Sequence, residues 1–138
     1  TNGGANGSGL NLIAYCFAPK QGFSKMGSYT GNGNADGPFI YTGFKPAMII
    51  RKNVNAADEW TLIDSTRSPF NPTNATLVPN STAADSTDWD TDIFSNGFKP
   101  RTVESAHNGN GNKIIYMAFA KNPFVTSTAN GSIPATAR

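Results

Sequence analysis

Three observations predict an all-β fold, an antiparallel β-sandwich of the jelly-roll-like kind with Gly/Asn-rich turns. Only two of the 138 residues are Glu, and the apolar residues lean towards Phe, Ile, Tyr and Trp, which suit strands better than helices. The dipeptide Asn-Gly, the strongest short signal for a tight β-turn, occurs seven times. The apolar runs between these turns are short, as strands are.

The apolar runs, taken along the chain, predict the individual strands. Residues 10–17 and 113–119 are apolar at both odd and even positions, so both faces of each strand must be covered. We expect them to be central strands of a closed sandwich, or strands covered by a neighbouring subunit. Residues 48–52 and 60–64 flank a polar loop and predict an antiparallel hairpin. The other expected strands are 23–29, 38–41, 76–78 and 93–94.

An internal sequence repeat, called the internal echo below, suggests how the chain is organised. Residues 6–18 match residues 108–120 at six of thirteen positions, and the tetrapeptide Gly-Phe-Lys-Pro at 43–46 recurs at 97–100. The longer echo predicts that residues 1–20 are the terminal strand of, or a link to, a preceding module. Residues 21–128 then form the β-sandwich domain, and residues 129–138, which lack periodicity, form an extended C-terminal tail.

Charge and hydropathy exclude several classes of protein. Eleven basic and nine acidic residues leave a formal charge of +2, and the basic residues are scattered, which argues against nucleic-acid binding. No apolar stretch approaches the ~20 residues that span a bilayer, so we expect no membrane insertion. The Gly-rich segment 31–37 imitates a phosphate loop but lacks the following Lys-Ser/Thr, so it predicts a β-turn loop.

The residues that could support catalysis are few, so we expect no enzyme and no catalytic residue. The single histidine, His107, stands beside an Asn-Gly turn and is predicted to be exposed in a loop. The single cysteine, Cys16, lies in an apolar run and is predicted to be a buried, inert thiol.

A second group of residues suits carbohydrate recognition. Trp89 lies between Asp88 and Asp90, and an aromatic ring beside carboxylates can stack on a sugar while the carboxylates accept hydrogen bonds from its hydroxyls. Tyr29 is a further aromatic candidate. The glycan-binding candidates are therefore Trp89, Tyr29, Asp88 and Asp90, and a third functional hypothesis makes the same acidic segment the site of a glycan-active enzyme.

The spacing of Asp88, Asp90 and Asp92 also resembles the start of a calcium-binding EF-hand loop. The resemblance fails further on, because Ile93 stands where glycine is needed and Lys99 where glutamate is needed. We expect no cofactor, and a calcium ion at these three aspartates is the one metal hypothesis that remains.

Two longer motifs resemble a known family. They are GFSKMGSYTGNG at 22–33 and DGPFIYTGFKPA at 36–47, followed by FSNGFK at 94–99, IYMAFA at 115–120, NPF at 122–124 and the terminal Ala-Arg. Together they resemble the C-terminal β-rich module of tail-fibre and related virion structural proteins of tailed bacteriophages. The likeness extends over nearly the whole chain and implies no catalytic residues. The acidic segment 85–92 departs from the pattern, so a binding role there would be particular to this protein.

The resemblance implies a structural protein of the virion exterior, exposed to the extracellular medium. We expect the tip of a tail fibre or another appendage, which attaches to a host-surface glycan and assembles with copies of itself as a trimer or filament, and with other virion proteins. The alternative is a purely architectural virion protein, a capsid decoration or filament-forming subunit without receptor binding.

Overall fold

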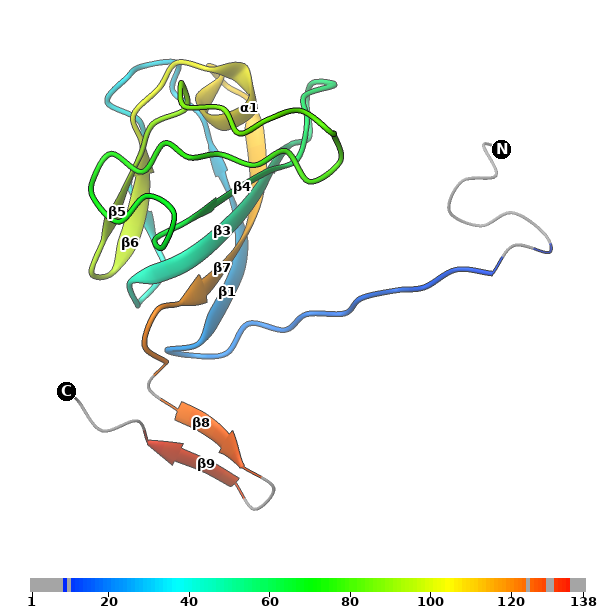
Figure 1. Ribbon diagram of the computed structural model, residues 1–138, viewed down its shortest axis with the longest axis vertical. Coiled ribbons are helices and arrows are strands. Elements are labelled where there is room, and N and C mark those ends of the chain that lie inside the picture. Colours follow the sequence, from blue (N-terminus) through cyan, green and yellow to red (C-terminus); the bar gives the residue numbers. More distant parts are fainter. Residues whose placement is uncertain (1–8, 10, 124, 129–130, 135–138) are drawn as a thin grey trace.

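The computed structural model describes residues 9, 11–123, 125–128 and 131–134, and it confirms the predicted all-β fold. Two antiparallel sheets of unequal size lie against each other as a sandwich, and a long connection between β4 and β5 runs across their open side (Figure 1). Within the described residues, no helix is long and apolar enough to cross a membrane.

The larger sheet has four strands in the order β1-β7-β3-β4. Its strands are β1 (Ser24–Thr30), β3 (Pro46–Asn53), β4 (Thr61–Asp64) and β7 (Lys113–Ala120). The predicted hairpin is confirmed, because β3 and β4 pair antiparallel with Ile49 opposite Ile63. The run at 113–119 is a central strand, as predicted, because β7 pairs with β1 on one edge and β3 on the other. The expected cover on both faces is found on one face only, since Ile115 and Met117 on the outer face are partly exposed.

The smaller sheet has three strands in the order β2-β6-β5. Its strands are β2 (Ile40–Tyr41), β5 (Thr91–Phe94) and β6 (Gly97–Pro100). One helical turn, α1 (Ser105–Asn108), connects β6 to β7. Beyond β7, β8 (Val125–Thr128) and β9 (Gly131–Pro134) pair as a separate hairpin, so the expected tail at 129–138 falls partly on β9 and partly outside the described residues.

The core fills the space between the two sheets. Ile49, Ile63 and Ile114 from the larger sheet have no exposed surface, and neither has Phe98 from the smaller one. Phe98 packs edge-on against Tyr116 with ring centroids 5.4 Å apart. The two Gly-Phe-Lys-Pro segments serve the same purpose, because Phe44 in the first is buried like Phe98 in the second.

The larger sheet presents an apolar face away from the core. Side chains alternate along each strand, so the neighbours of the buried residues point outwards. Met26, Met117 and Ile50 are cross-strand neighbours in one row, and Leu62 on β4 completes it. Met48 lies in the next row, so all three methionines of the chain lie on this partly exposed face.

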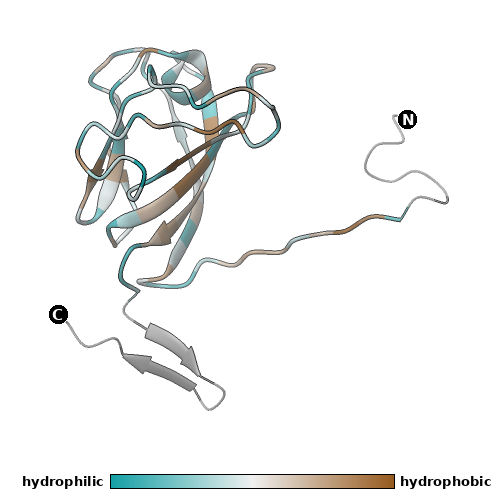
Figure 2. Cartoon of the chain, in the orientation of Figure 1, coloured by the Kyte–Doolittle hydropathy of each residue, from teal (hydrophilic) through white to brown (hydrophobic). Residues whose placement is uncertain are grey.

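The expected strand at 10–17 is not present in the described part of this segment. Residues 11–19, which we call the arm, form no strand and leave the sandwich as an exposed, extended segment with hydrophobic stretches (Figures 1 and 2). Ile13 and Tyr15 are each 82% exposed. The prediction of a buried Cys16 was wrong, since its thiol is exposed. A strand with two apolar faces needs cover on both, whereas residues 11–19 are exposed in the described chain.

Candidate functional site

A polar groove of about 330 Å³ lies beside the smaller sheet, where residues from three loops meet the ends of β5 and β6. It contains two of the aspartates that sequence analysis singled out. Its lining residues are Ala35, Asn71, Pro72, Asp90, Asp92 and Arg101.

The antiparallel pairing of β5 with β6 gathers the charged side chains of this groove. Asp92 stands opposite Lys99, and the Arg101 N–H donates to the Asp90 carbonyl at 2.9 Å, which extends the same ladder by one pair. Thr91 and Ile93, at the alternate positions of β5, are buried. Alternation therefore places Asp90 and Asp92 on the outer face of the sheet, together with Lys99 and Arg101.

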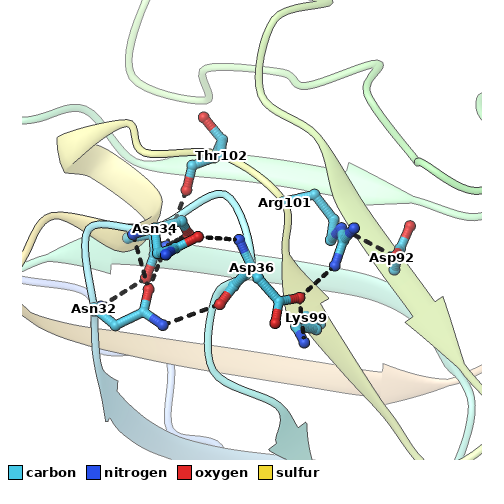
Figure 3. A network of polar contacts seen from close by, with 8 residues as sticks. Asn32, Asn34, Asp36, Asp92, Lys99, Arg101 and Thr102 are labelled. Carbon is cyan, nitrogen blue, oxygen red and sulfur yellow. Dashed lines mark hydrogen bonds and ion pairs between the residues drawn. The ribbon is translucent and has the colours of Figure 1, made fainter.

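Asp36 links these charges to the loop at 31–37. Its Oδ1 accepts hydrogen bonds from Lys99 Nζ and Arg101 Nη1, each at 2.6 Å, and Arg101 Nε lies 3.5 Å from Asp92 Oδ2 (Figure 3). Hydrogen bonding from Lys99 and the charges of both cations hold the pKa of the Asp36 carboxyl below its usual value. Asp36 thereby fixes Arg101, which lines the groove, and holds Lys99 beside it.

Asparagines set the shape of the loop that carries Asp36, and the segment is a loop, as predicted. The Asn32 side-chain oxygen accepts the Asn34 N–H at 3.0 Å, and the Asn34 oxygen accepts the Asp36 N–H at 2.8 Å. The buried Asn108 amide donates to the Asn34 carbonyl from the other side. A Cβ at Gly37 would lie 2.5 Å from the Pro100 carbonyl oxygen, so only glycine fits this close approach.

Asn71 attaches the far wall of the groove to β5. Its amide donates to the Ile93 carbonyl and its oxygen accepts the Ile93 N–H, both at 2.9 Å. The preceding residue, Phe70, is 82% exposed. Sequence analysis missed this aromatic residue, although its place between Pro69 and the Asn71-Pro72 pair in a turn-rich segment was a usable signal for exposure.

Trp89 and Tyr29, the predicted sugar-stacking residues, both contact one buried histidine, His107. The half-buried Trp89 ring meets the His107 ring edge-on, with centroids 5.1 Å apart. The Tyr29 hydroxyl donates to the His107 carbonyl at 2.7 Å, and the Tyr29 ring packs against Phe98. Burial raises the pKa of the Tyr29 hydroxyl. Much of each ring surface is therefore in contact with the protein, and neither residue lines the groove.

The prediction of an exposed His107 was wrong, because its side chain has no exposed surface. The residues beside the Asn-Gly turn form α1, which folds inwards over one end of the sandwich. His107 Nε2 lies 3.0 Å from Thr61 Oγ1. Burial and then repulsion by the Arg51 guanidinium lower the pKa of His107 well below 6.5, so the ring is neutral at neutral pH.

Arg51 is the companion of His107 in the interior. It is completely buried and donates from Nη1 to Thr91 Oγ1 at 3.1 Å. Its Nε and Nη2, like His107 Nδ1, find no hydrogen-bond partner among the described residues. Since both side chains are fully enclosed, neither contacts a ligand held in the surface groove.

The three aspartates proposed for calcium do not form a cation site in the part of the chain that the structure covers. No group of three or more His, Cys, Asp or Glu residues there is close enough to hold a metal ion. Asp92 faces Arg101 instead, while Asp88 and Asp90 make no ion pair with a described residue. Among the glycan-binding candidates, Asp90 alone lines the groove.

Fold and site together define a small antiparallel β-sandwich with a charged surface groove and a projecting apolar arm. The chain belongs to the family described as Domain of unknown function (DUF7483), which matches residues 1–123. No match was found among curated proteins or among solved structures.

Proposed function

We propose that this chain is a structural module of a bacteriophage virion, at the tip of a tail fibre or another exterior appendage, which attaches to host-surface glycans and assembles with copies of itself. The motifs at 22–33 and 36–47 support the virion assignment by resemblance. The β-sandwich suits a structural, surface-exposed role. The observation that carries the attachment role is the polar groove at Asp90, Asp92 and Arg101.

The groove has the chemistry that a glycan requires. The Asp90 carboxylate, which has no cation partner among the described residues, can accept hydrogen bonds from sugar hydroxyls. Arg101 can donate through the N–H groups that Asp36 and Asp92 leave free. Phe70, one residue from the Asn71 wall, exposes an aromatic ring of the kind that stacks on a pyranose. The volume of about 330 Å³ suits one or two sugar units rather than a long chain.

Binding of the purified chain to an array of bacterial envelope polysaccharides tests the attachment role. We expect Asp90→Asn and Phe70→Ala each to weaken binding at least about tenfold, which is ~1.4 kcal/mol. Glu104→Gln is the matched control, because Glu104 is an exposed acid outside the groove. Equal binding by all four proteins, or no binding by the unmodified chain to any polysaccharide, would overturn the proposal.

The exposed arm favours a second candidate function, the purely architectural virion protein. An extended segment with Ile13 and Tyr15 each 82% exposed suits contact between subunits better than contact with a sugar. In this alternative the groove binds nothing and the protein acts through its assembly alone. Self-association in solution, together with no binding to any polysaccharide of the array, would favour the architectural alternative.

A further inference from the structure

We infer that the arm of one chain binds the free edge of β1 in a second copy of the same chain and adds a fifth strand to the four-stranded sheet. The inference deepens the proposed function and rests on its self-assembly. The occupant of the edge is a segment of this protein, and the interface joins two identical chains. Strand addition of this kind uses backbone hydrogen bonds for affinity and side-chain pockets for specificity.

Backbone geometry shows that the outer edge of β1 is open. The Ala120 N–H donates to the Phe23 carbonyl and the Gly31 N–H donates to the Asn112 carbonyl, both at 2.8 Å. In an antiparallel pair the bonding direction alternates, so odd-numbered residues of β1 bond towards β7 and even-numbered residues point the other way. Met26, Ser28 and Thr30 therefore direct their N–H and C=O groups outwards, where no described strand pairs with them.

The outer edge of β1 is used at its first residue by the chain itself. Ser24 exchanges two backbone hydrogen bonds of 2.9 Å with Lys20, one in each direction. This bridge closes the turn at residues 21–23, and the arm before Lys20 leaves the edge. The backbone from Met26 to Thr30 continues the same edge without a partner in the described chain.

A groove beside the edge gives room for side chains. It measures about 440 Å³ and lies between β1 and β2, the strands that end the two sheets on the same side. Its lining residues include Lys25, Tyr41 and Thr42, together with Pro19 and Lys20 at the base of the arm. A strand placed along β1 would turn one face into this groove and the other towards the methionine-rich outer face. The arm is apolar on both faces and fits both environments.

The course of the arm favours a second copy over closure on its own β1. Phe17 packs edge-on against Phe119, with ring centroids 6.0 Å apart. Phe119 follows the buried Ala118 in β7, so alternation along the strand turns its side chain to the outer face of the sheet. The base of the arm lines the groove at Pro19, and from Phe17 the chain leads away from the sandwich. The residues before Phe17 are therefore free to reach a neighbour (Figure 1). Exchange of such a segment between identical chains is a common route to oligomers.

The mass of the full chain in solution, measured by light scattering over a range of concentrations, tests the inference. We expect species heavier than the 14.6 kDa monomer. Tyr15→Asp should shift the mass to that of the monomer, because it places a charge on the arm. Val103→Asp is the matched control, since Val103 is also apolar and 59% exposed but lies outside the arm and both grooves, and it should leave the mass unchanged. An unmodified chain that stays monomeric, or equal effects of the two substitutions, would overturn the inference.

A mixing experiment separates exchange between chains from closure within one chain. Ser28→Pro removes one outward N–H of β1 without touching the bonds to β7, a change that edge strands tolerate. This variant keeps a working arm, whereas Tyr15→Asp keeps a working edge. Each should be monomeric alone, and an equal mixture should form a dimer through one arm and one edge. A mixture that stays monomeric would contradict the inference.

Two checks show whether a change in mass comes from the interface, from unfolding or from the glycan groove. Circular dichroism establishes that each variant is folded, and Thr30→Pro provides the same block at the end of β1 if Ser28→Pro does not fold. The polysaccharide array is run on the same proteins. The polar groove lies on the smaller sheet, whereas the free edge of β1 belongs to the larger one. Glycan binding without self-association would therefore contradict strand exchange alone, and self-association without glycan binding would contradict the attachment role alone.

Discussion

The arm and β7 have related sequences and opposite environments. Aligned at the spacing of the internal echo, Leu12 corresponds to Ile114 and Phe17 to Phe119. Ile114 has no exposed surface, whereas Leu12 is 58% exposed. β7 pairs along both edges, with β1 and β3, whereas the arm pairs along neither. An apolar run of this kind therefore becomes a strand only where neighbouring strands pair with its edges and other residues pack against its faces.

Matched truncations at the two corresponding positions should give the largest contrast. Ile114→Ala removes buried methyl groups from the core and should lower the free energy of unfolding by about 2–5 kcal/mol. Leu12→Ala should change it by less than about 0.5 kcal/mol in the monomer, because the side chain is mostly in solvent. Urea unfolding of both variants measures the contrast, and similar losses would show that the arm is packed in solution.

Acid should lower the free energy of unfolding through His107, which lies in α1 beside β7, and should not change the arm. The pKa of His107 is lowered in the folded chain, so below pH 6.5 this histidine is protonated in the unfolded chain but stays neutral in the folded chain. The contribution of His107 to the free energy of unfolding is therefore fully present above pH 6.5. It decreases as the pH falls below 6.5, by up to ~1.4 kcal/mol per pH unit. Urea unfolding at several pH values between 5 and 7.5 measures this slope. His107→Gln should flatten it, and an unchanged slope in that variant would assign the pH dependence to other groups.

A smaller effect should distinguish the two faces of β1. A Cβ at Gly27 would lie 3.1 Å from the Tyr116 ring, which Phe98 and Tyr29 hold in place. Gly27→Ala should therefore lower the melting temperature, with a loss of about 1 kcal/mol from overpacking. Ser28→Ala, on the exposed face of the same strand, should have almost no effect. Equal melting temperatures for the two variants would mean that Tyr116 moves aside.

The least disruptive test is the reactivity of the arm thiol. In the native chain Cys16 should react with a thiol reagent within roughly tenfold of the rate in denaturant, because no unfolding step is needed to expose it. Its rate should fall at concentrations where the chain self-associates. A rate slower by several orders of magnitude at every concentration would indicate that the arm is covered within the monomer.

The elements that could be predicted depend on neighbours close in sequence. The hairpin of β3 and β4 followed from two apolar runs around one polar loop, and the central position of β7 from apolar residues on both faces. Each of these patterns is complete within about fifteen residues of the chain.

The features that could not be predicted depend on contacts between distant residues. His107 is buried because α1 closes over Thr61, 46 residues earlier, and no local pattern encodes that contact. Asp36 lies beside the groove because its carboxylate binds Arg101, 65 residues later. The arm was expected to be covered because its residues are apolar at odd and even positions, but a local pattern does not encode which surface would cover it.

The outer face of the larger sheet gives the protein a chemical property as well as a shape. Because Met26, Met48 and Met117 are the whole methionine content of the chain, the interior contains no thioether, and an oxidant meets sulfur only on that face and at Cys16. Conversion to the sulfoxide would make a large part of the face polar without opening the core. Ageing in air would thus alter the surface of this protein before its fold.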